Sequence, residues 1–197
     1  MKNVDLTRFQ QQLKGTSSKA RPLPPVEKWD PDFCGDINLT IALDGRWFYE
    51  GSPIGRASLV QLFASVLKRE DENYFLVTPV EKVGITVEDT PFLVTQWQKE
   101  KGERTDDDVF TFTTQTGDEI RLEHAEQLEL RVPPKAIQDP QATPIPYINV
   151  RRNLWARLHQ NVYYQLLEHA DEHANESVTS FSIRSSGKRF ILGEVAR

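Results

Sequence analysis

The sequence is short of the residues that cross-link a chain or anchor it in a membrane. Its 197 residues include one cysteine, Cys34, which excludes an internal disulfide and a multi-cysteine metal site. A lone thiol favours a reducing compartment, so we expect a cytoplasmic protein. No stretch approaches the roughly 20 apolar residues of a membrane-spanning helix, and residues 1–12 lack the apolar run of a secretory signal.

An excess of positive charge is also lacking. The chain has 24 Lys and Arg against 29 Asp and Glu, a formal net charge of −5, which disfavours broad electrostatic binding of nucleic acid. Nucleic acid stays open as an alternative partner because residues 1–28 hold six basic residues against two acids, and the region of Arg151 is also basic.

Recognisable catalytic motifs are missing as well. The chain has no phosphate-binding glycine loop and no nucleophile-elbow serine; residues 51–55 keep only the outer glycines of one. Glu81, Glu88 and Asp89 are the carboxylates that a hydrolase could pair, although acids beside turns and strand ends are commonly only solvated. We expect no enzyme, no cofactor and no metal site, with a carboxylate-based hydrolase as an alternative.

The clearest local pattern lies in residues 44–67. Asp44-Gly45 separates the apolar run 41–43 from the aromatic run 47–49 and predicts a hairpin turn in which both residues have positive φ. After this hairpin, apolar residues recur at i, i+3, i+4, i+7 and i+8, which predicts a helix with one buried face. These residues are Leu59, Leu62, Phe63, Val66 and Leu67.

The remaining chain alternates short β-type runs with turns. Strands are predicted at 36–43, 74–77, 85–88, 92–98, 109–114, 119–123, 128–132 and 147–158, the last with a bend at 151–153. Residues 99–108 are predicted to be an exposed loop, and five prolines exclude a helix or a central strand from 133–146. A second helix at 162–170 and a hairpin of 178–183 with 189–192 close the chain.

These elements predict an α+β fold in two small domains. Residues 1–28 are expected to be a flexible basic tail, 29–83 an N-terminal α+β domain, and 84–197 a β-rich domain with one helix and the proline-rich connector 133–146. An offset of 104 residues superposes the two helix patterns, for example Leu62 on Leu166 and Phe63 on Leu167. This favours a weak internal repeat of strands, helix and hairpin, although any two amphipathic helices can be aligned in this way.

Three smaller features have competing interpretations. His169 and His173 have the i, i+4 spacing of two ligands on one helix, but they also suit the polar end of a helix. Cys34 is predicted to be a buried structural thiol rather than a nucleophile. Arg184, Lys188 and Arg189 surround Gly187 in a hairpin that can meet a phosphate or remain solvated.

Several stretches resemble one uncharacterised family of small proteobacterial proteins, known only as a domain of unknown function. They are residues 34–37, 44–49, 51–56, 78–82, 87–89, 91–92, 146–151 and 154–157. The resemblance covers nearly all of the chain after Lys28. It implies a duplicated α+β core, a C-terminal half superficially like a pleckstrin-homology fold, and a cleft between the halves that binds a ligand or nucleic acid. A pleckstrin-like barrel ends in a helix, whereas this chain is predicted to end in a hairpin.

The function expected from the sequence is therefore a non-enzymatic ligand-binding or signalling module. Its partner would be a small anionic ligand or a protein, because arginines and aromatics gather near the turns of both halves. Arg56 opens a helix, where a cation is unfavourable without an anion beside it; Glu81 or Glu88 is the internal alternative to a ligand. The predicted site consists of Trp47, Tyr49, Arg56, Glu81, Glu88, Tyr147, Arg151 and Arg157.

Overall fold

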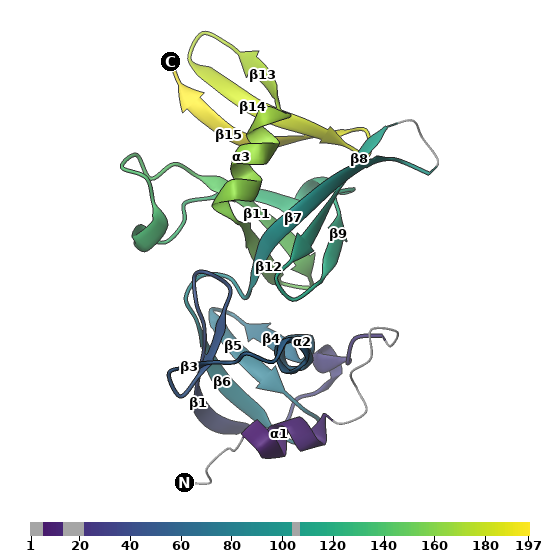
Figure 1. Ribbon diagram of the computed structural model, residues 1–197, viewed down its shortest axis with the longest axis vertical. Helices are drawn as coiled ribbons and strands as arrows, with labels where there is room; N and C mark the ends of the chain where they lie inside the picture. Colours follow the sequence, from purple (N-terminus) through teal and green to yellow (C-terminus); the bar gives the residue numbers. More distant parts are fainter. Residues whose placement is uncertain (1–5, 14–21, 104–106) are drawn as a thin grey trace. The chain divides into compact units, whose positions relative to one another are not determined.

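A computed structural model describes residues 6–13, 22–103 and 107–197 (Figure 1). The chain divides into two compact units, unit 1 up to Glu88 and unit 2 from Asp89 onward. The sequence placed a division before residue 84; in the structure, β6 (Lys82–Val87) pairs with strands of unit 1 along its length. Among the described residues, no helix has the length and apolar character needed to cross a membrane.

Unit 1 is a mixed six-stranded sheet with one face buried. The strand order is β3-β2-β1-β6-β5-β4, and only β1 and β6 run parallel. Its elements are η1 (Val26–Lys28), β1 (Phe33–Ile41), β2 (Trp47–Tyr49), β3 (Ser52–Pro53), α2 (Ala57–Ser65), β4 (Leu67–Glu70), β5 (Asn73–Val77) and β6. Helix α2 is confirmed, and its buried Phe63 stacks on Trp47 of β2, while Leu62 of the helix and Leu39 and Ile41 of β1 are also buried. The interior of the unit lies on this face.

The turn between β1 and β2 differs from the predicted one. Gly45 has φ of 82°, whereas Asp44 does not have a positive φ. Gly45 N donates to Ala42 O and Ala42 N donates to Arg46 O, each at 2.9 Å, so three residues close the hairpin. This is the arrangement of a type I turn followed by a left-handed residue, in which one glycine suffices.

The N-terminal segment is not simply a flexible tail. Residues Leu6–Gln12 form helix α1, and the Phe9 and Leu13 side chains are each 1% exposed. The Phe9 ring meets Phe63 of α2 edge-on, with 6.2 Å between ring centroids. Burial of two large apolar side chains explains why this short helix stays on the unit. Residues 1–5 and 14–21 of the predicted tail lie outside the described residues.

Unit 2 combines a second mixed six-stranded sheet with a three-stranded one. The orders are β10-β11-β12-β7-β8-β9 and β13-β14-β15, with β12 and β7 parallel. The strands are β7 (Phe92–Lys101), β8 (Asp108–Thr114), β9 (Glu119–Arg121), β10 (Leu128–Arg131), β11 (Ile145–Arg151), β12 (Leu154–Leu158), β13 (Asp171–Ala174), β14 (Val178–Ser185) and β15 (Lys188–Ala196). The helices are η2 (Ala125–Gln127), η3 (Lys135–Ile137) and α3 (Gln160–Glu168), which packs against β7 and β14 (Figure 1). One of the two six-stranded sheets curls into a half-barrel.

Three predictions for unit 2 need correction. Part of the loop predicted at 99–108 is strand, because residues 99–101 and 108 extend the β7–β8 ladder. Lys99 and Lys101 form ion pairs with Asp108 across this ladder, which stabilise the polar end of the hairpin. Pro146 lies in β11, an interior strand; it pairs only with β10, because β12 first pairs at Tyr147. Residues 171–174, which were predicted to be the polar end of a helix, form β13. The other predicted strands of this unit and α3 are confirmed.

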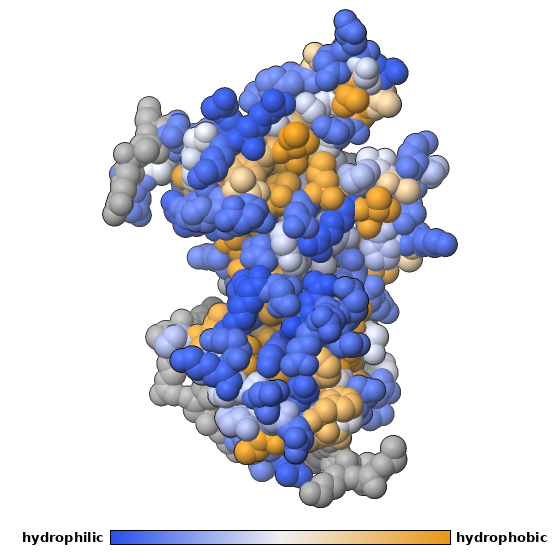
Figure 2. Space-filling view, turned by 180° about the vertical axis from the view of Figure 1, so that it is seen from behind, coloured by the Kyte–Doolittle hydropathy of each residue, from blue (hydrophilic) through white to orange (hydrophobic). Residues whose placement is uncertain are grey.

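Polar and apolar side chains share the surface of both units. Figure 2 shows one face of the molecule, on which polar groups predominate and apolar groups gather in patches. The exposed large apolar residues of unit 2 are Val132, Ile137, Tyr164, Ile191 and Val195.

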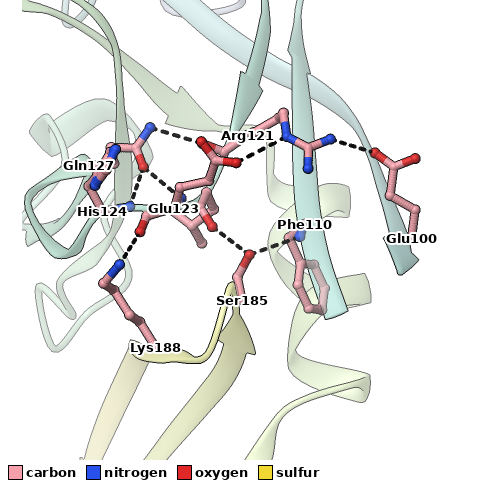
Figure 3. A network of polar contacts seen from close by, with 9 residues as sticks. Glu100, Phe110, Arg121, Glu123, His124, Gln127, Ser185 and Lys188 are labelled. Atoms are coloured by element: carbon pink, nitrogen blue, oxygen red, sulfur yellow. Dashed lines mark hydrogen bonds and ion pairs between the residues drawn. The ribbon is translucent and has the colours of Figure 1, made fainter. Parts of the chain in front are cut away.

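A buried serine joins the two sheets of unit 2. Leu122 N donates to Phe110 O at 2.9 Å, and in a regular antiparallel pair Phe110 N would donate back to Leu122 O. Instead, Phe110 N donates to Ser185 Oγ at 2.9 Å, and Ser185 Oγ donates to Leu122 O at 2.6 Å (Figure 3). Ser186 N also donates to Asp108 O at 2.8 Å. The tip of the β14–β15 hairpin is therefore held between β8 and the residue that follows β9.

We expect Ser185→Ala to lower the free energy of unfolding by about 1–3 kcal/mol, because a buried amide and a buried carbonyl each lose a partner. Urea denaturation measures this difference. Ser177→Ala, at an exposed serine of the same unit, is the control and should change stability by less than about 0.5 kcal/mol. Equal stabilities of the two variants would show that the ladder closes without the hydroxyl.

Candidate functional site

Asp89, Tyr147 and Arg157 form a charged cluster in unit 2. Tyr147 on β11 lies directly opposite Arg157 on β12, so their side chains share one face of the sheet. Asp89 Oδ2 accepts hydrogen bonds from the Tyr147 hydroxyl at 3.0 Å and from Arg157 Nη1 at 2.6 Å. The backbone of Arg157 is also held, since its N–H donates to Thr90 Oγ1 at 3.1 Å.

Burial makes this cluster a rigid element. Tyr147 is 2% exposed and Arg157 7% exposed. Burial, together with the negative charge of Asp89 and the hydrogen bond to it, raises the pKa of Tyr147 well above its usual range, so the hydroxyl remains a donor at neutral pH. The structure therefore shows the predicted ligand residues Tyr147 and Arg157 bound to an internal carboxylate.

Arg151 engages a different carboxylate. Its Nη1 donates to Asp118 Oδ1 at 2.6 Å, and its guanidinium lies over the Phe92 ring, 4.9 Å from the centroid. Burial lowers the pKa of Arg151, and the charge of Asp118 works against that shift. Asp118 in turn accepts hydrogen bonds from the hydroxyls of Thr114 and Thr116. Arg151 is thus part of the β8–β9 turn network.

Arg131 is a site residue that the sequence reasoning missed. Its guanidinium centre lies 4.3 Å from the ring centroid of Trp155 and 5.3 Å from that of Tyr147. Glu129 Oε2 accepts from Arg131 Nε and Nη2 at 2.9 and 2.8 Å. The alternation of Glu129 and Arg131 with Leu128 and Leu130 puts both charged groups on one face of β10, but only the strand register brings Arg131 to the two rings.

We call the outer surface of β10, β11 and β12 the arginine–aromatic face. The opposite face is apolar and carries Ile148, Ala156 and Leu158, each 2% exposed or less. The Arg131 side chain is 32% exposed and that of Glu129 50% exposed, so this part of the face meets solvent. The face consists of Glu129, Arg131, Tyr147, Trp155 and Arg157.

In unit 1 the predicted aromatic residues take different roles from those expected. Trp47 is 1% exposed and stacks on Phe63 with 6.5 Å between centroids, so it belongs to the interior. Phe48 lies on the opposite face of β2, with the guanidinium centre of Arg46 over its ring, 5.1 Å from the ring centroid. The register with β1 decides this, because Trp47 pairs with buried Ile41. Tyr49 is half-buried.

Arg56 is exposed at the N-cap of α2 and forms no ion pair with a described residue. The internal partners proposed for it are engaged elsewhere. Glu88 Oε2 accepts from Leu43 N at 2.8 Å, and Glu81 interacts with Arg8 and Gln12 of α1. The expectation that Glu81 or Glu88 neutralises Arg56 is therefore wrong.

The predicted shared cleft draws on both units. Trp47, Tyr49 and Arg56 belong to unit 1, whereas Tyr147, Arg151 and Arg157 belong to unit 2. A cleft shared by the two units stays a prediction.

The histidine and cysteine candidates take structural positions. His169 caps α3 and its ring meets Trp97 edge-on at 5.1 Å, whereas His173 lies in β13, so the two do not share a helix. In the described part of the chain, no group of three His, Cys, Asp or Glu side chains is placed to hold a metal ion. Cys34 is exposed rather than buried, because it lies at the irregular start of β1 beside Gly35, whose φ is 109°.

Two basic side chains of the hairpin around Gly187, those of Lys188 and Arg189, form hydrogen bonds within the unit. Lys188 Nζ donates to Glu123 O at 2.6 Å (Figure 3). Arg189 donates to the hydroxyls of Ser182 and Ser180 at 3.0 and 3.1 Å. These contacts favour a structural role for the hairpin over phosphate binding.

The fold and the site define a two-domain, mostly β protein in which many charged groups form internal pairs. Residues 24–90 match the N-terminal domain model of the DUF1285 family, a domain of unknown function, and residues 91–192 match its C-terminal domain model. The chain belongs to the DUF1285 family, which confirms the resemblance seen in its sequence.

Two solved structures are similar to this chain. A crystal structure of a DUF1285 family protein from Silicibacter pomeroyi DSS-3 is 37% identical, has a TM-score of 0.77 and matches over 95% of both chains. One from Shewanella baltica OS155 is 28% identical with a TM-score of 0.52, and the match covers 68% of this chain and 92% of that one. No curated protein matches.

We expect Asp89→Asn to lower the free energy of unfolding by about 3–5 kcal/mol, because the buried Arg157 loses its countercharge. Glu129→Gln is the matched control, since it makes the same chemical change beside an exposed arginine and should cost no more than about 1 kcal/mol. Chemical denaturation compares the two. An Asp89→Asn variant as stable as Glu129→Gln would contradict the importance of the buried pair.

Proposed function

We propose that this protein is a non-enzymatic binding module, and that its arginine–aromatic face binds an anionic group of a small ligand or of a protein partner. The proposal rests on Arg131, whose guanidinium centre lies over the Trp155 and Tyr147 rings while its side chain is 32% exposed and pairs with Glu129. A guanidinium fixed in this way presents its N–H fork to a carboxylate or phosphate with little loss of rotamer freedom.

Glu129 occupies the position that a ligand anion would take. Both hydrogen bonds from Arg131 go to one oxygen of Glu129, on a side chain that is half exposed. Exposed ion pairs contribute only about 0–1 kcal/mol, so an external anion can replace Glu129 at small cost. The two rings would keep the guanidinium in place during the exchange.

The cluster of Asp89, Tyr147 and Arg157 fixes part of this face. Asp89 binds both Arg157 and the Tyr147 hydroxyl, which fixes the ring on which Arg131 lies. Asp89 and Arg157 are therefore positioning residues in this proposal, and Arg131 is the group that touches the ligand.

Binding of inorganic phosphate, citrate and a hexaglutamate peptide should raise the melting temperature of the native chain. Arg131→Gln should weaken binding by at least about tenfold, the factor that 1.4 kcal/mol represents. Arg121→Gln is the matched control, because Arg121 is also a surface arginine paired with glutamates, and it should bind like the native chain. Glu129→Gln should bind more tightly because it removes the internal competitor.

The three probes separate the possible sources of the anion. Stabilisation by phosphate or citrate indicates a small ligand, and stabilisation by hexaglutamate alone indicates an acidic protein segment. A single-stranded oligonucleotide that binds with a steep salt dependence, and is unaffected by Arg131→Gln, would replace the proposal with nucleic-acid binding. Equal responses of Arg131→Gln and Arg121→Gln would overturn it.

The non-enzymatic character is part of the proposal. It is supported by the engagement of the candidate carboxylates: Glu81 with Arg8, Glu88 with the Leu43 amide and Asp89 with Arg157. Hydrolase panels with phosphate and carboxylic esters should therefore stay at background. Turnover that disappears in Glu81→Gln or Asp89→Asn would favour the carboxylate-based hydrolase instead.

We also propose that the halves arose by duplication, and that the C-terminal half is a partial barrel of the pleckstrin-homology kind. The 104-residue offset carries β4 onto β13 residue for residue and α2 onto α3 within one residue. It also overlaps β5 with β14 and β6 with β15. The halves differ in strand pairing. In unit 1, β6 pairs with β1. In unit 2, the strand beside β12 is β7, which is not the strand that the offset matches to β6. The last element that the structure describes is the strand β15.

A further inference from the structure

Helix α1 rests on unit 1 through an apolar contact and a set of polar ones. Phe9 and Leu13, four residues apart, are each 1% exposed, and the Phe9 ring packs against Phe63 of α2. The surface beneath the helix is formed by α2 and by the turn between β5 and β6, which carries Thr78 and Glu81. We call this surface the α1 groove, with Phe63, Thr78 and Glu81 as its members.

The polar contacts recognise specific side chains of the helix. Both ends of the Gln12 amide are used: Nε2 donates to Glu81 Oε2 at 2.9 Å, and Oε1 accepts from Thr78 Oγ1 at 2.8 Å. Arg8 Nη2 lies 3.4 Å from the other Glu81 oxygen. The Glu81 side chain is 10% exposed, whereas that of Arg8 is 58% exposed. A nearly buried carboxylate in the groove is therefore matched to an amide and a cation on the helix.

Helix α1 depends on the groove more than the groove depends on α1. Seven residues are too few for a stable isolated helix in water, so its helical form requires the contacts of Phe9 and Leu13. The groove residues all lie within residues 24–90, the match to the family's N-terminal domain, whereas α1 lies outside that match. The α1 groove therefore belongs to the part of the chain that matches the domain model, and α1 precedes that part.

We propose that the α1 groove is a recognition site for an amphipathic helix of a partner protein, and that α1 occupies it in the absence of the partner. The partner helix would carry the pattern of residues 8–13. In this pattern a basic residue is followed directly by an aromatic one, and Gln and Leu come three and four residues after the aromatic residue. Binding of the partner displaces α1, so α1 acts as an intramolecular competitor. The proposal concerns unit 1 and does not depend on the arginine–aromatic face of unit 2.

A labelled peptide of residues 3–14 serves as the probe, and fluorescence anisotropy measures its binding to the full chain. Arg8→Glu in the chain places a negative charge beside Glu81 and weakens the internal helix, while the exposure of Arg8 keeps the fold intact. The peptide should bind this variant at least about tenfold more tightly than the native chain, because the internal competitor is weakened. Gln11→Glu, a negative charge at an exposed position of the same helix, is the control and should bind like the native chain.

Two changes test the recognition itself. Adding Glu81→Gln to the Arg8→Glu chain should weaken peptide binding by at least about tenfold, and a Phe9→Ala peptide should fail to bind. Equal peptide affinities for the native and Arg8→Glu chains, or equal binding of the Phe9→Ala peptide, would overturn the proposal. A concentration-dependent dimer of the native chain that Arg8→Glu abolishes would also overturn it, because the groove would then hold α1 of a second copy.

Discussion

The ion pair between Asp89 and Arg157, which also binds the Tyr147 hydroxyl, is the interaction on which unit 2 and its candidate site depend. One oxygen of Asp89 accepts hydrogen bonds from both Tyr147 and Arg157, which face each other across two adjacent strands. A nearly buried guanidinium needs such a partner, because an uncompensated charge in a low-dielectric environment costs several kcal/mol. Once the pair is formed, the Tyr147 ring has a fixed position, and the Arg131 guanidinium can lie on it and on Trp155.

Unit 1 contains a comparable arrangement, in which the carboxylate of Glu81 is bound by polar side chains. Its nearly buried carboxylate is satisfied by Gln12 and Arg8 of α1, so a polar group in the domain selects the side chains of the helix that covers it. In both units an acid holds a cation or an amide in place, and apolar packing supplies most of the driving force. The difference lies in the partners: Asp89 binds residues of two adjacent strands, whereas Glu81 binds side chains of helix α1.

Helices α2 and α3 and most strands could be predicted from the sequence because their signals are local. The spacing of Leu59, Leu62 and Phe63 predicted α2, and the β-type runs 109–114 and 119–123 predicted β8 and β9. The failures occurred where a long-range contact outweighed local preference. Polar residues 99–101 became strand because Lys99 and Lys101 reach Asp108 across the ladder. Helix α1 stayed on its unit because Phe9 found a buried place against Phe63.

By itself the sequence determined the fold class, the family and the residue types of the site, since periodicity and motifs are properties of neighbouring positions. Only the tertiary structure decided which charges meet. Arg157 and Arg151 were both candidates for a ligand, yet the strand register gave one to Asp89 and the other to Asp118. Arg131 entered the site for the same reason. An ion pair between residues some 30 to 70 positions apart leaves no local trace in a sequence, because its geometry exists only after the strands have paired.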